Sequence, residues 1–196
     1  MTEIGMGISN PYHGERRASF VGQPLPGVQV QLFNEYDEPI NEEAVPGEIR
    51  VKGDNVFQEY WDNDEATRES FKDGWFCTGD VAVVEDGYYR IMGRSSVDII
   101  KSGGYKLSAL EIEGVLLTHE SIAEVAVIGV PDDTWGEAVT AFIGLNKGAE
   151  LNYEDLKSWC NDKMSSYKIP KRIKIVDALP RNAMGKVTKP ALKEIV

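Results

Sequence analysis

The pattern of apolar and polar residues predicts mainly strands in the first half of the chain. Val28 to Phe33 alternates apolar with polar residues, as a half-buried strand does. Asp86-Gly87 separates two apolar runs and predicts a hairpin turn. The stretch before Val28 is rich in Gly and Pro and is expected to be loop with short extended pieces. The expected elements are strands at 28–33, 48–52, 81–84 and 88–92, and a short helix at 62–71.

After Gly93-Arg94 the pattern changes to strand, glycine turn, helix, strand, strand and helix. Ser108 and Glu111 have the spacing of a capping box, which predicts a helix start at Ser108. The remaining expected elements are strands at 124–130, 138–145 and 173–176, a helix at 152–164, and a terminal helix from Thr188. We therefore expect an α+β fold in two pieces, residues 1–94 and 95–196.

The charge of the chain is unevenly distributed. The net charge is −11, but residues 163–196 contain nine Lys/Arg against two Asp/Glu, so the preceding 162 residues carry −18. An acidic body disfavours nucleic acids and anionic membranes as partners. No apolar run approaches the ~18 residues of a membrane span. The first residues lack the pattern of a secretory signal, so the sequence predicts a soluble, intracellular protein.

Cysteine and histidine are too few for two common kinds of site. Cys77 and Cys160 cannot build a disulfide framework, and His13 and His119 do not supply a zinc constellation. The sequence also lacks the glycine-rich phosphate loop Gly-x-x-x-x-Gly-Lys-Ser/Thr and the dinucleotide pattern Gly-x-Gly-x-x-Gly.

Three motifs carry candidate chemistry, each with an ordinary structural explanation beside it. Thr78-Gly79-Asp80 follows the apolar residues 75–77, so Asp80 at a strand end can accept hydrogen bonds from ribose hydroxyls or form a turn. The segment 101–106 is a glycine turn between lysines that suits a close ligand or a tight hairpin. The loop 180–186 presents Lys186, a mobile cation suited to phosphate or carboxylate and also typical of a solvated surface.

The order and spacing of these motifs resemble the adenylate-forming superfamily of acyl-CoA synthetases, luciferases and peptide-synthetase adenylation domains. Met1-Thr2-Glu3 is similar to the end of its Tyr-Gly-Met-Thr-Glu motif, and residues 74–80 resemble Gly-Trp/Tyr-Phe-x-Thr-Gly-Asp. Residues 93–113 resemble the hinge and the glycine turn after it, and 180–186 resemble Pro-Arg-x-x-x-Gly-Lys. The resemblance implies that 1–94 is the β-rich end of the large AMP-binding domain and 95–196 the C-terminal lid.

Within the superfamily, the chain resembles malonyl-CoA synthetases most. Ser9-Asn10-Pro11-Tyr12 followed by Gly14-Glu15-Arg16 is typical of malonate activators. Two departures stand beside this resemblance. The chain starts inside the Tyr-Gly-Met-Thr-Glu motif, so we expect a fragment without the family's phosphate loop. The segment 95–98 is one residue longer than in most relatives, which leaves Ser96 and Asp98 both as hinge candidates.

The resemblance implies a two-step reaction with ATP, Mg²⁺ and coenzyme A. A carboxylate attacks the α-phosphate of ATP to give acyl-AMP, and the CoA thiol then attacks the acyl-AMP after the lid has rotated. Lys186 is expected to neutralise the joining anions in the first step. The other nucleotide and metal roles fall on Thr2 for phosphate, Glu3 for Mg²⁺, and Asp80 and Arg94 for the ribose.

The substrate and CoA roles complete the expected site. Arg16 is expected to pair with the second carboxylate of malonate, and Ser9 to donate a hydrogen bond to it. Gly103, Gly104 and Tyr105 are expected to line the pantetheine tunnel, with Lys106 meeting a CoA phosphate. Lys101 is a candidate for entering the site in the second half-reaction.

Three interpretations stay open at this point. The chain is part of a malonyl-CoA synthetase, part of a ligase for another acid such as methylmalonate, oxalate or acetate, or a non-catalytic lid module that binds a partner or nucleotide. The isolated chain is expected to be inactive. Localisation is expected in the cytoplasm or the mitochondrial matrix, since a presequence would precede this start.

Overall fold

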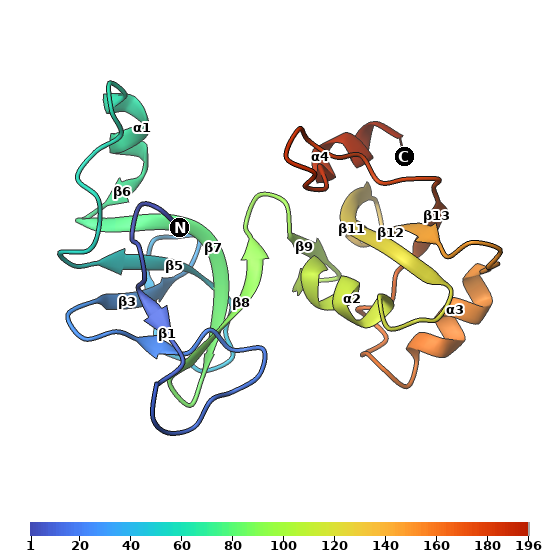
Figure 1. Ribbon diagram of the computed structural model, residues 1–196, viewed down its shortest axis with the longest axis horizontal. Helices are drawn as coiled ribbons and strands as arrows, with labels where there is room; N and C mark the ends of the chain where they lie inside the picture. The colour runs from blue at the N-terminus through green and yellow to red at the C-terminus, as the bar shows by residue number, and fades with distance from the viewer. Residues whose placement is uncertain (196) are drawn as a thin grey trace. The chain divides into compact units, whose positions relative to one another are not determined.

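The computed structural model describes residues 1–195 and divides the chain into two compact units, Met1–Ile91 and Met92–Val196. The change from one unit to the next falls three residues before the boundary expected from the sequence, which was placed after residue 94. The buried apolar residues of each unit form their own core. Figure 1 shows the first unit in blue to green and the second in light green to red.

The N-terminal unit is built on an antiparallel sheet in the order β4-β3-β5-β7-β6, with β8 paired to β7. Alternation buries one face: Leu32, Ile49 and Val51 lie in the core, and Gln29 and Lys52 are exposed. A separate two-stranded sheet joins β1 and β2. The strands are β1 (Ile8–Ser9), β2 (Gln23–Pro24), β3 (Gln29–Phe33), β4 (Pro39–Ile40), β5 (Gly47–Lys52), β6 (Phe71–Lys72), β7 (Trp75–Glu85) and β8 (Tyr88–Arg94).

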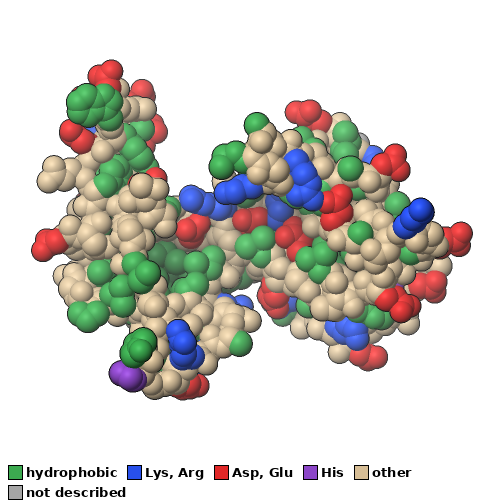
Figure 2. All heavy atoms as spheres, in the orientation of Figure 1, with side chains coloured by type: hydrophobic (Ala, Val, Ile, Leu, Met, Phe, Trp, Pro, Cys, Tyr) green, Lys and Arg blue, Asp and Glu red, His purple; other side chains and the backbone are tan. Residues whose placement is uncertain are grey.

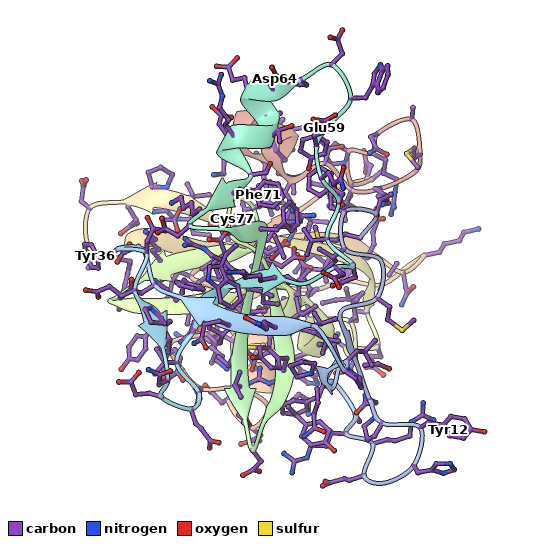
Figure 3. All side chains as sticks on the ribbon, turned by 90° about the vertical axis from the view of Figure 1, so that its left-hand side faces the viewer. Tyr12, Tyr36, Glu59, Asp64, Phe71 and Cys77 are labelled. Carbon is purple, nitrogen blue, oxygen red and sulfur yellow. The ribbon has the colours of Figure 1, made fainter. Side chains whose placement is uncertain are left out.

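A short helix, α1 (Asp64–Glu69), precedes the β6 edge strand. Asn63 caps it, since its side chain accepts a hydrogen bond from the Ala66 N–H at 3.1 Å. The helix is shorter than the expected 62–71, because Phe71 instead pairs with Phe76 in the sheet and stacks on Phe57. Figure 3 shows Phe71 and Cys77 next to each other beneath the helix that Asp64 begins.

The Asp86-Gly87 hairpin is confirmed, but the strand before it is much longer than 81–84. Consequently, the expectation that Thr78-Gly79-Asp80 follows a strand end is wrong, because β7 continues through it. The β5–β7 register shifts between Glu48 and Arg50, opposite this motif. Gly79 takes φ +72° there, a left-handed conformation that a bulge tolerates in glycine. The motif therefore lies in a bulged strand.

The C-terminal unit has a mixed sheet in the order β10-β9-β12-β11, with β13 parallel to β12. Strand β12 is central and pairs with β11, β9 and β13, whereas β11 lies at the edge. Apolar residues cover both faces, as the nearly continuous burial of β11 and β12 shows. The strands are β9 (Ile99–Ser102), β10 (Tyr105–Ser108), β11 (Ile122–Asp132), β12 (Gly136–Leu145) and β13 (Arg172–Ile175).

Helices cover this sheet. The predicted cap at Ser108 is confirmed: α2 (Ala109–Leu116) begins there, and the Ser108 hydroxyl accepts the Glu111 N–H at 3.1 Å. In α3 (Tyr153–Cys160), the buried Leu156 and Cys160 face the core. This helix ends four residues before the expected 164: the Asn161 N–H bonds to the Ser158 carbonyl, three residues earlier, and residues 161–163 form turns. The terminal helix α4 (Lys189–Leu192) follows Thr188 and is extended by a 3₁₀ turn, Lys193–Ile195.

Candidate functional site

Asp80, an expected nucleotide residue of the N-terminal unit, lines a hollow of about 200 Å³. The hollow is lined by Met1 and residues 4–8, by Thr78 and Asp80 of β7, and by Ile91 of β8. Thr2 and Glu3 lie between Met1 and Ile4 in the sequence but do not line the hollow. The arrangement suits a ligand that contacts the first residues and the β7 bulge together.

Two backbone contacts fix the first segment. The Glu3 carbonyl accepts the Phe57 N–H at 2.7 Å, and the Ile4 carbonyl accepts the Asn55 side-chain amide at 2.8 Å. The Glu3 carboxylate is half-buried and accepts the Tyr60 hydroxyl through Oε1 at 3.2 Å. Among residues 1–195, no group of three or more His, Cys, Asp or Glu side chains could hold a metal. A single carboxylate nevertheless fits Mg²⁺, which is commonly held by one or two carboxylates with phosphate oxygens and water.

Asp80 is positioned by its neighbours in the bulge. The buried Thr78 hydroxyl donates to the Ile49 carbonyl at 2.7 Å and accepts the Asp80 N–H at 3.1 Å. The Gly79 N–H donates to the Glu48 carboxylate at 3.2 Å. These contacts fix the backbone on both sides of the Asp80 side chain, which is half-buried at the hollow. A preformed carboxylate of this kind can accept hydrogen bonds from neighbouring hydroxyls.

Ser9 and Arg16 line a second hollow of the same unit, of about 370 Å³. Asn10 closes the loop between them: its side chain donates to the Phe20 carbonyl at 2.9 Å and accepts the Arg17 N–H at 3.2 Å. Figure 3 shows Tyr12 at the tip of this projecting loop, at the opposite end of the unit from Asp64. Within residues 1–195, the exposed Arg16 guanidinium has no hydrogen-bond or ion-pair partner, so it is available to an anion.

Arg17 has a different environment. Its guanidinium binds the carboxylates of Glu15 and Asp86, both at 3.0 Å, and lies over the Tyr88 ring at 4.4 Å. Because Asp86 is in the β7–β8 turn, Arg17 attaches the loop to the sheet. The two consecutive arginines therefore have different contacts: Arg17 attaches the loop to the sheet, and Arg16 lines the hollow.

Gly22 allows the strand β2 to approach the Ser9–Asn10 backbone, and replacing it should destabilise the N-terminal unit. A Cβ on Gly22, which has φ +110°, would lie 2.0 Å from the Ser9 carbonyl carbon. We expect Gly22→Ala to lower the free energy of unfolding by at least about 3 kcal/mol, from backbone clash and strain together. Gly27→Ala is the control: Gly27 also has positive φ (+82°) but no atom within 4 Å of its Cβ, so it should cost about 1 kcal/mol. Equal losses in chemical denaturation of both variants would contradict the close approach.

In the C-terminal unit, the glycine turn joins β9 to β10. Gly103 and Gly104 have φ +57° and +83°, and the Gly103 N–H donates to the Trp135 carbonyl at 2.9 Å. A Cβ on Gly104 would meet nothing within 4 Å, so the backbone there is open to a ligand. Tyr105 does not lie free: its ring stacks on that of Tyr167 at 4.5 Å and 11°. No sequence pattern predicted this aromatic pair.

Two lysines flank the glycine turn. Lys101 and Lys106 are both exposed and lie opposite each other in the register of β9 and β10. The Lys101 N–H donates to the Glu137 carboxylate at 2.6 Å. Figure 2 shows acidic and basic side chains interspersed on the visible face of this unit. The positive charge of the C-terminal segment is thus partly compensated by acidic neighbours, as the ion pairs Lys168–Glu111 and Arg172–Asp132 illustrate.

Lys186 stands on a compact loop. The Asn182 N–H donates to the Lys186 carbonyl at 2.9 Å, and the Thr188 N–H donates to the Pro180 carbonyl at 2.8 Å. The Asn182 side chain also accepts the Lys186 N–H at 3.0 Å. The Lys186 side chain itself is exposed, so a rigid loop presents a flexible cation.

The base of the loop is held to β11. Arg181 forms an ion pair with Glu124, whose carboxylate also accepts the Leu179 N–H at 2.9 Å. The Leu179 N–H and Arg181 lower the pKa of Glu124, so the carboxylate stays charged at neutral pH. This contact fixes where the Lys186 loop leaves the sheet.

The candidate hinge forms a turn at the start of the C-terminal unit. Asp98 is buried, its N–H donates to the Arg94 carbonyl, and its carboxylate accepts the Arg94 N–H, at 2.8 and 2.9 Å. Ser96 is exposed in the same turn, and Arg94 is exposed just before it. Ser108 in turn donates to the Met92 carbonyl at 2.6 Å. The structure therefore places Arg94, Ser96 and Asp98 together.

Sequence reasoning missed a cluster beneath this turn. The Lys189 ammonium lies 2.6 Å from Asp98 Oδ1 and 2.8 Å from Glu113 Oε1. All three side chains are nearly buried, with exposed fractions of 11–13%. Burial raises the pKa of Glu113, and the hydrogen bonds from Lys189 and the Val127 N–H oppose that shift. The one sequence signal that pointed to this cluster was the position of Lys189, three residues after Lys186.

Comparison with known families matches two segments of the chain. Residues 1–61 match the model of the AMP-binding enzyme, and residues 111–186 match its C-terminal domain. In the part that the structure describes, no helix has the length and apolar character needed to cross a bilayer.

The most similar relatives include malonate–CoA ligases. The mitochondrial malonate–CoA ligase ACSF3 of Bos taurus is 48% identical over 96% of the chain, and the malonate–CoA ligase of Arabidopsis thaliana is 49% identical over 99%. The crystal structure of ATP-bound MatB from Rhodopseudomonas palustris covers the whole chain at 39% identity with a TM-score of 0.84. The chain spans 36%, 33% and 39% of these three proteins, respectively.

Proposed function

Because the chain belongs to the AMP-binding enzymes, we propose that it is part of an AMP-forming ligase that converts malonate to malonyl-CoA. One observation carries the choice of substrate: Arg16, a cation without a protein partner among residues 1–195, lines the same hollow as Ser9. A second carboxylate that enters an active site must be paired, and a guanidinium matches its geometry. The identity with malonate–CoA ligases supports the same substrate.

The first step joins two anions, the malonate carboxylate and the α-phosphate of ATP. Lys186 would supply the positive charge that offsets their repulsion and the charge that develops in the transition state. Its exposed side chain suits this role, because hydrogen bonds within the loop hold its backbone, and the flexible side chain lets the ammonium reach the anions.

The nucleotide would occupy the hollow at the β7 bulge. Asp80, which lines this hollow, would accept hydrogen bonds from the ribose hydroxyls. Arg94 remains a candidate donor to the ribose, and Thr2 would contact phosphate. Mg²⁺ bound to Glu3 would neutralise phosphate charge. Tyr60 orients the Glu3 carboxylate by its hydroxyl hydrogen bond, so one oxygen is held and the other stays open to the ion.

Thioester formation would use the glycine turn of the C-terminal unit. Gly104 leaves open space where the pantetheine arm of CoA would pass, and Gly103 is fixed by its bond to Trp135. Tyr105, held by its stack on Tyr167, would form one wall. Lys106 would meet a CoA phosphate, and Lys101 would approach the acyl-adenylate in this second step.

The proposal extends to where the reaction takes place and to the alternatives. We place it in the cytoplasm or the mitochondrial matrix, since the Bos taurus relative is named as mitochondrial. A ligase for methylmalonate, oxalate or acetate, and a lid module that only binds a partner or nucleotide, remain the competing functions. The experiment below separates all three.

Pyrophosphate release tests the proposal in two preparations. The first is the 196-residue chain alone, which should show no release from ATP and malonate, because it contains no glycine-rich phosphate loop. The second is the complete enzyme, meaning this chain joined to the N-terminal portion that its relatives carry, which should release pyrophosphate with malonate. Faster release with methylmalonate, oxalate or acetate than with malonate would assign that acid as the substrate instead. Release by the isolated chain, or none by the complete enzyme, would contradict the proposal.

A further inference from the structure

The Lys189 ammonium joins segments that are far apart in the sequence. Asp98 lies 91 residues before it, in the turn at the start of the C-terminal unit, and Glu113 lies on α2. Each carboxylate has a second bond: Asp98 Oδ2 accepts the Arg94 N–H at 2.9 Å, and Glu113 Oε1 accepts the Val127 N–H of β11 at 2.7 Å. The lysine thus connects the turn, α2 and β11 through one charge.

The geometry around Asp98 leaves little freedom. A Cβ on Gly93, which has φ +125°, would lie 2.4 Å from the Asp98 Cβ, so glycine is needed for this side chain to reach Lys189. The Asp98 carbonyl also accepts the Ala109 N–H at 2.8 Å. Segment 93–98 is therefore packed onto the lid body through Asp98.

On the other side, Lys189 is the first residue of α4 and follows the Lys186 loop directly. This helix has only four residues and no side-chain cap from Thr188, so it contributes little stability of its own. Its position depends on the burial of Leu192 in the core and on the Lys189 contacts. A nearly buried lysine between two carboxylates is strongly held, because removing it leaves two facing anions.

We propose that Lys189 is a positioning residue: by bridging Asp98 and Glu113, it ties the Lys186 loop to the segment 93–98, so that the two move as one body. A change in the backbone of 93–98 is then transmitted to the loop that carries Lys186. This inference concerns the C-terminal unit alone, and its consequence for catalysis rests on the proposed function.

Hydrogen–deuterium exchange of the 196-residue chain tests the tie without any activity. Lys189→Met should raise exchange about tenfold in both 93–98 and 180–188. Lys193→Met, which changes an exposed lysine on the following turn, should leave both segments unchanged. Lys189→Arg keeps the charge and should restore most of the protection. If exchange rises in 180–188 but stays unchanged in 93–98, Lys189 only holds α4, and the proposal is wrong.

A second variant covers the case in which Lys189→Met does not fold. Asp98→Asn keeps the size of the side chain and weakens the same ion pair, so it should raise exchange in 180–188 from the other side of the contact. If it loosens 93–98 alone, the two segments are not tied, and the proposal is overturned.

The catalytic consequence is measured in the complete enzyme. Lys189→Met should lower kcat for adenylate formation about tenfold and leave KM for ATP within about threefold, with partial rescue by Lys189→Arg, because a misplaced Lys186 affects the transition state more than binding. If kcat is unchanged while exchange is raised, Lys189 connects the two segments but has no role in catalysis. An inactive wild-type enzyme would instead count against the proposed function and leave the exchange result intact.

Discussion

Lys186→Ala in the complete enzyme should slow acyl-adenylate formation by a factor on the order of 10³. Loss of one preorganised charge contact to a developing oxyanion typically has an effect of this size. Thioester formation from pre-made malonyl-AMP should be nearly unchanged, because Lys186 is assigned to the first step alone. Pyrophosphate release measures the first step, and single-turnover formation of malonyl-CoA measures the second.

The Lys186→Ala substitution should leave the fold of its loop intact, so its effects on the two half-reactions can be compared directly. The Lys186 loop is closed by backbone bonds and by the Arg181–Glu124 pair, and none of these involves the Lys186 ammonium. The alanine variant should therefore keep the loop. Lys193→Ala, at an exposed position of the same unit, serves as the control and should retain both half-reactions. Equal losses in the two half-reactions of Lys186→Ala would make the lysine structural.

Arg16→Met in the complete enzyme should change the ratio of malonate to propionate kcat/KM by at least ~100-fold. Its removal leaves the distal carboxylate of malonate unpaired, which should cost about 3–5 kcal/mol for malonate. Propionate brings no second charge, so it should lose little. The measurement is kcat/KM for each acid, compared between variant and wild type. Equal losses on both acids would mean that Arg16 holds the loop rather than the substrate.

The adjacent arginine is unsuitable as a control. Arg17 binds Glu15, Asp86 and the Tyr88 ring, so its replacement would release the loop that carries Arg16. Arg68 is the better choice, because it is an exposed arginine on α1 of the same unit, outside the hollow. Arg68→Met should leave the acid ratio within about threefold.

Local signals in the sequence were sufficient where a feature depends on near neighbours. The Ser108 cap and the Asp86-Gly87 turn are each determined within a few residues, and both are confirmed. The predicted helix at 152–164 is longer than α3, because turns at 161–163, which begin with the bond from the Asn161 N–H to the Ser158 carbonyl, replace its last part.

Features that depend on distant strands could not be predicted in this way. The bulge that holds Asp80 arises from the register of β7 against β5, which no pattern within β7 reveals. The Asp98–Lys189 pair joins residues 91 positions apart, and either residue alone reads as an ordinary surface charge. The roles of Lys186, Arg16 and the other candidate residues stay predictions, which the half-reaction and substrate-ratio measurements address.

The separate cores of the two units have a practical consequence for spectroscopy. The four tryptophans divide evenly: Trp61 and Trp75 belong to the N-terminal unit, and Trp135 and Trp159 to the C-terminal unit. With two cores, denaturation of the chain need not follow a single two-state transition. Replacing one pair of indoles with phenylalanine would leave fluorescence that reports on one unit only, so that the Gly22 and Lys189 variants can each be followed in the unit they alter.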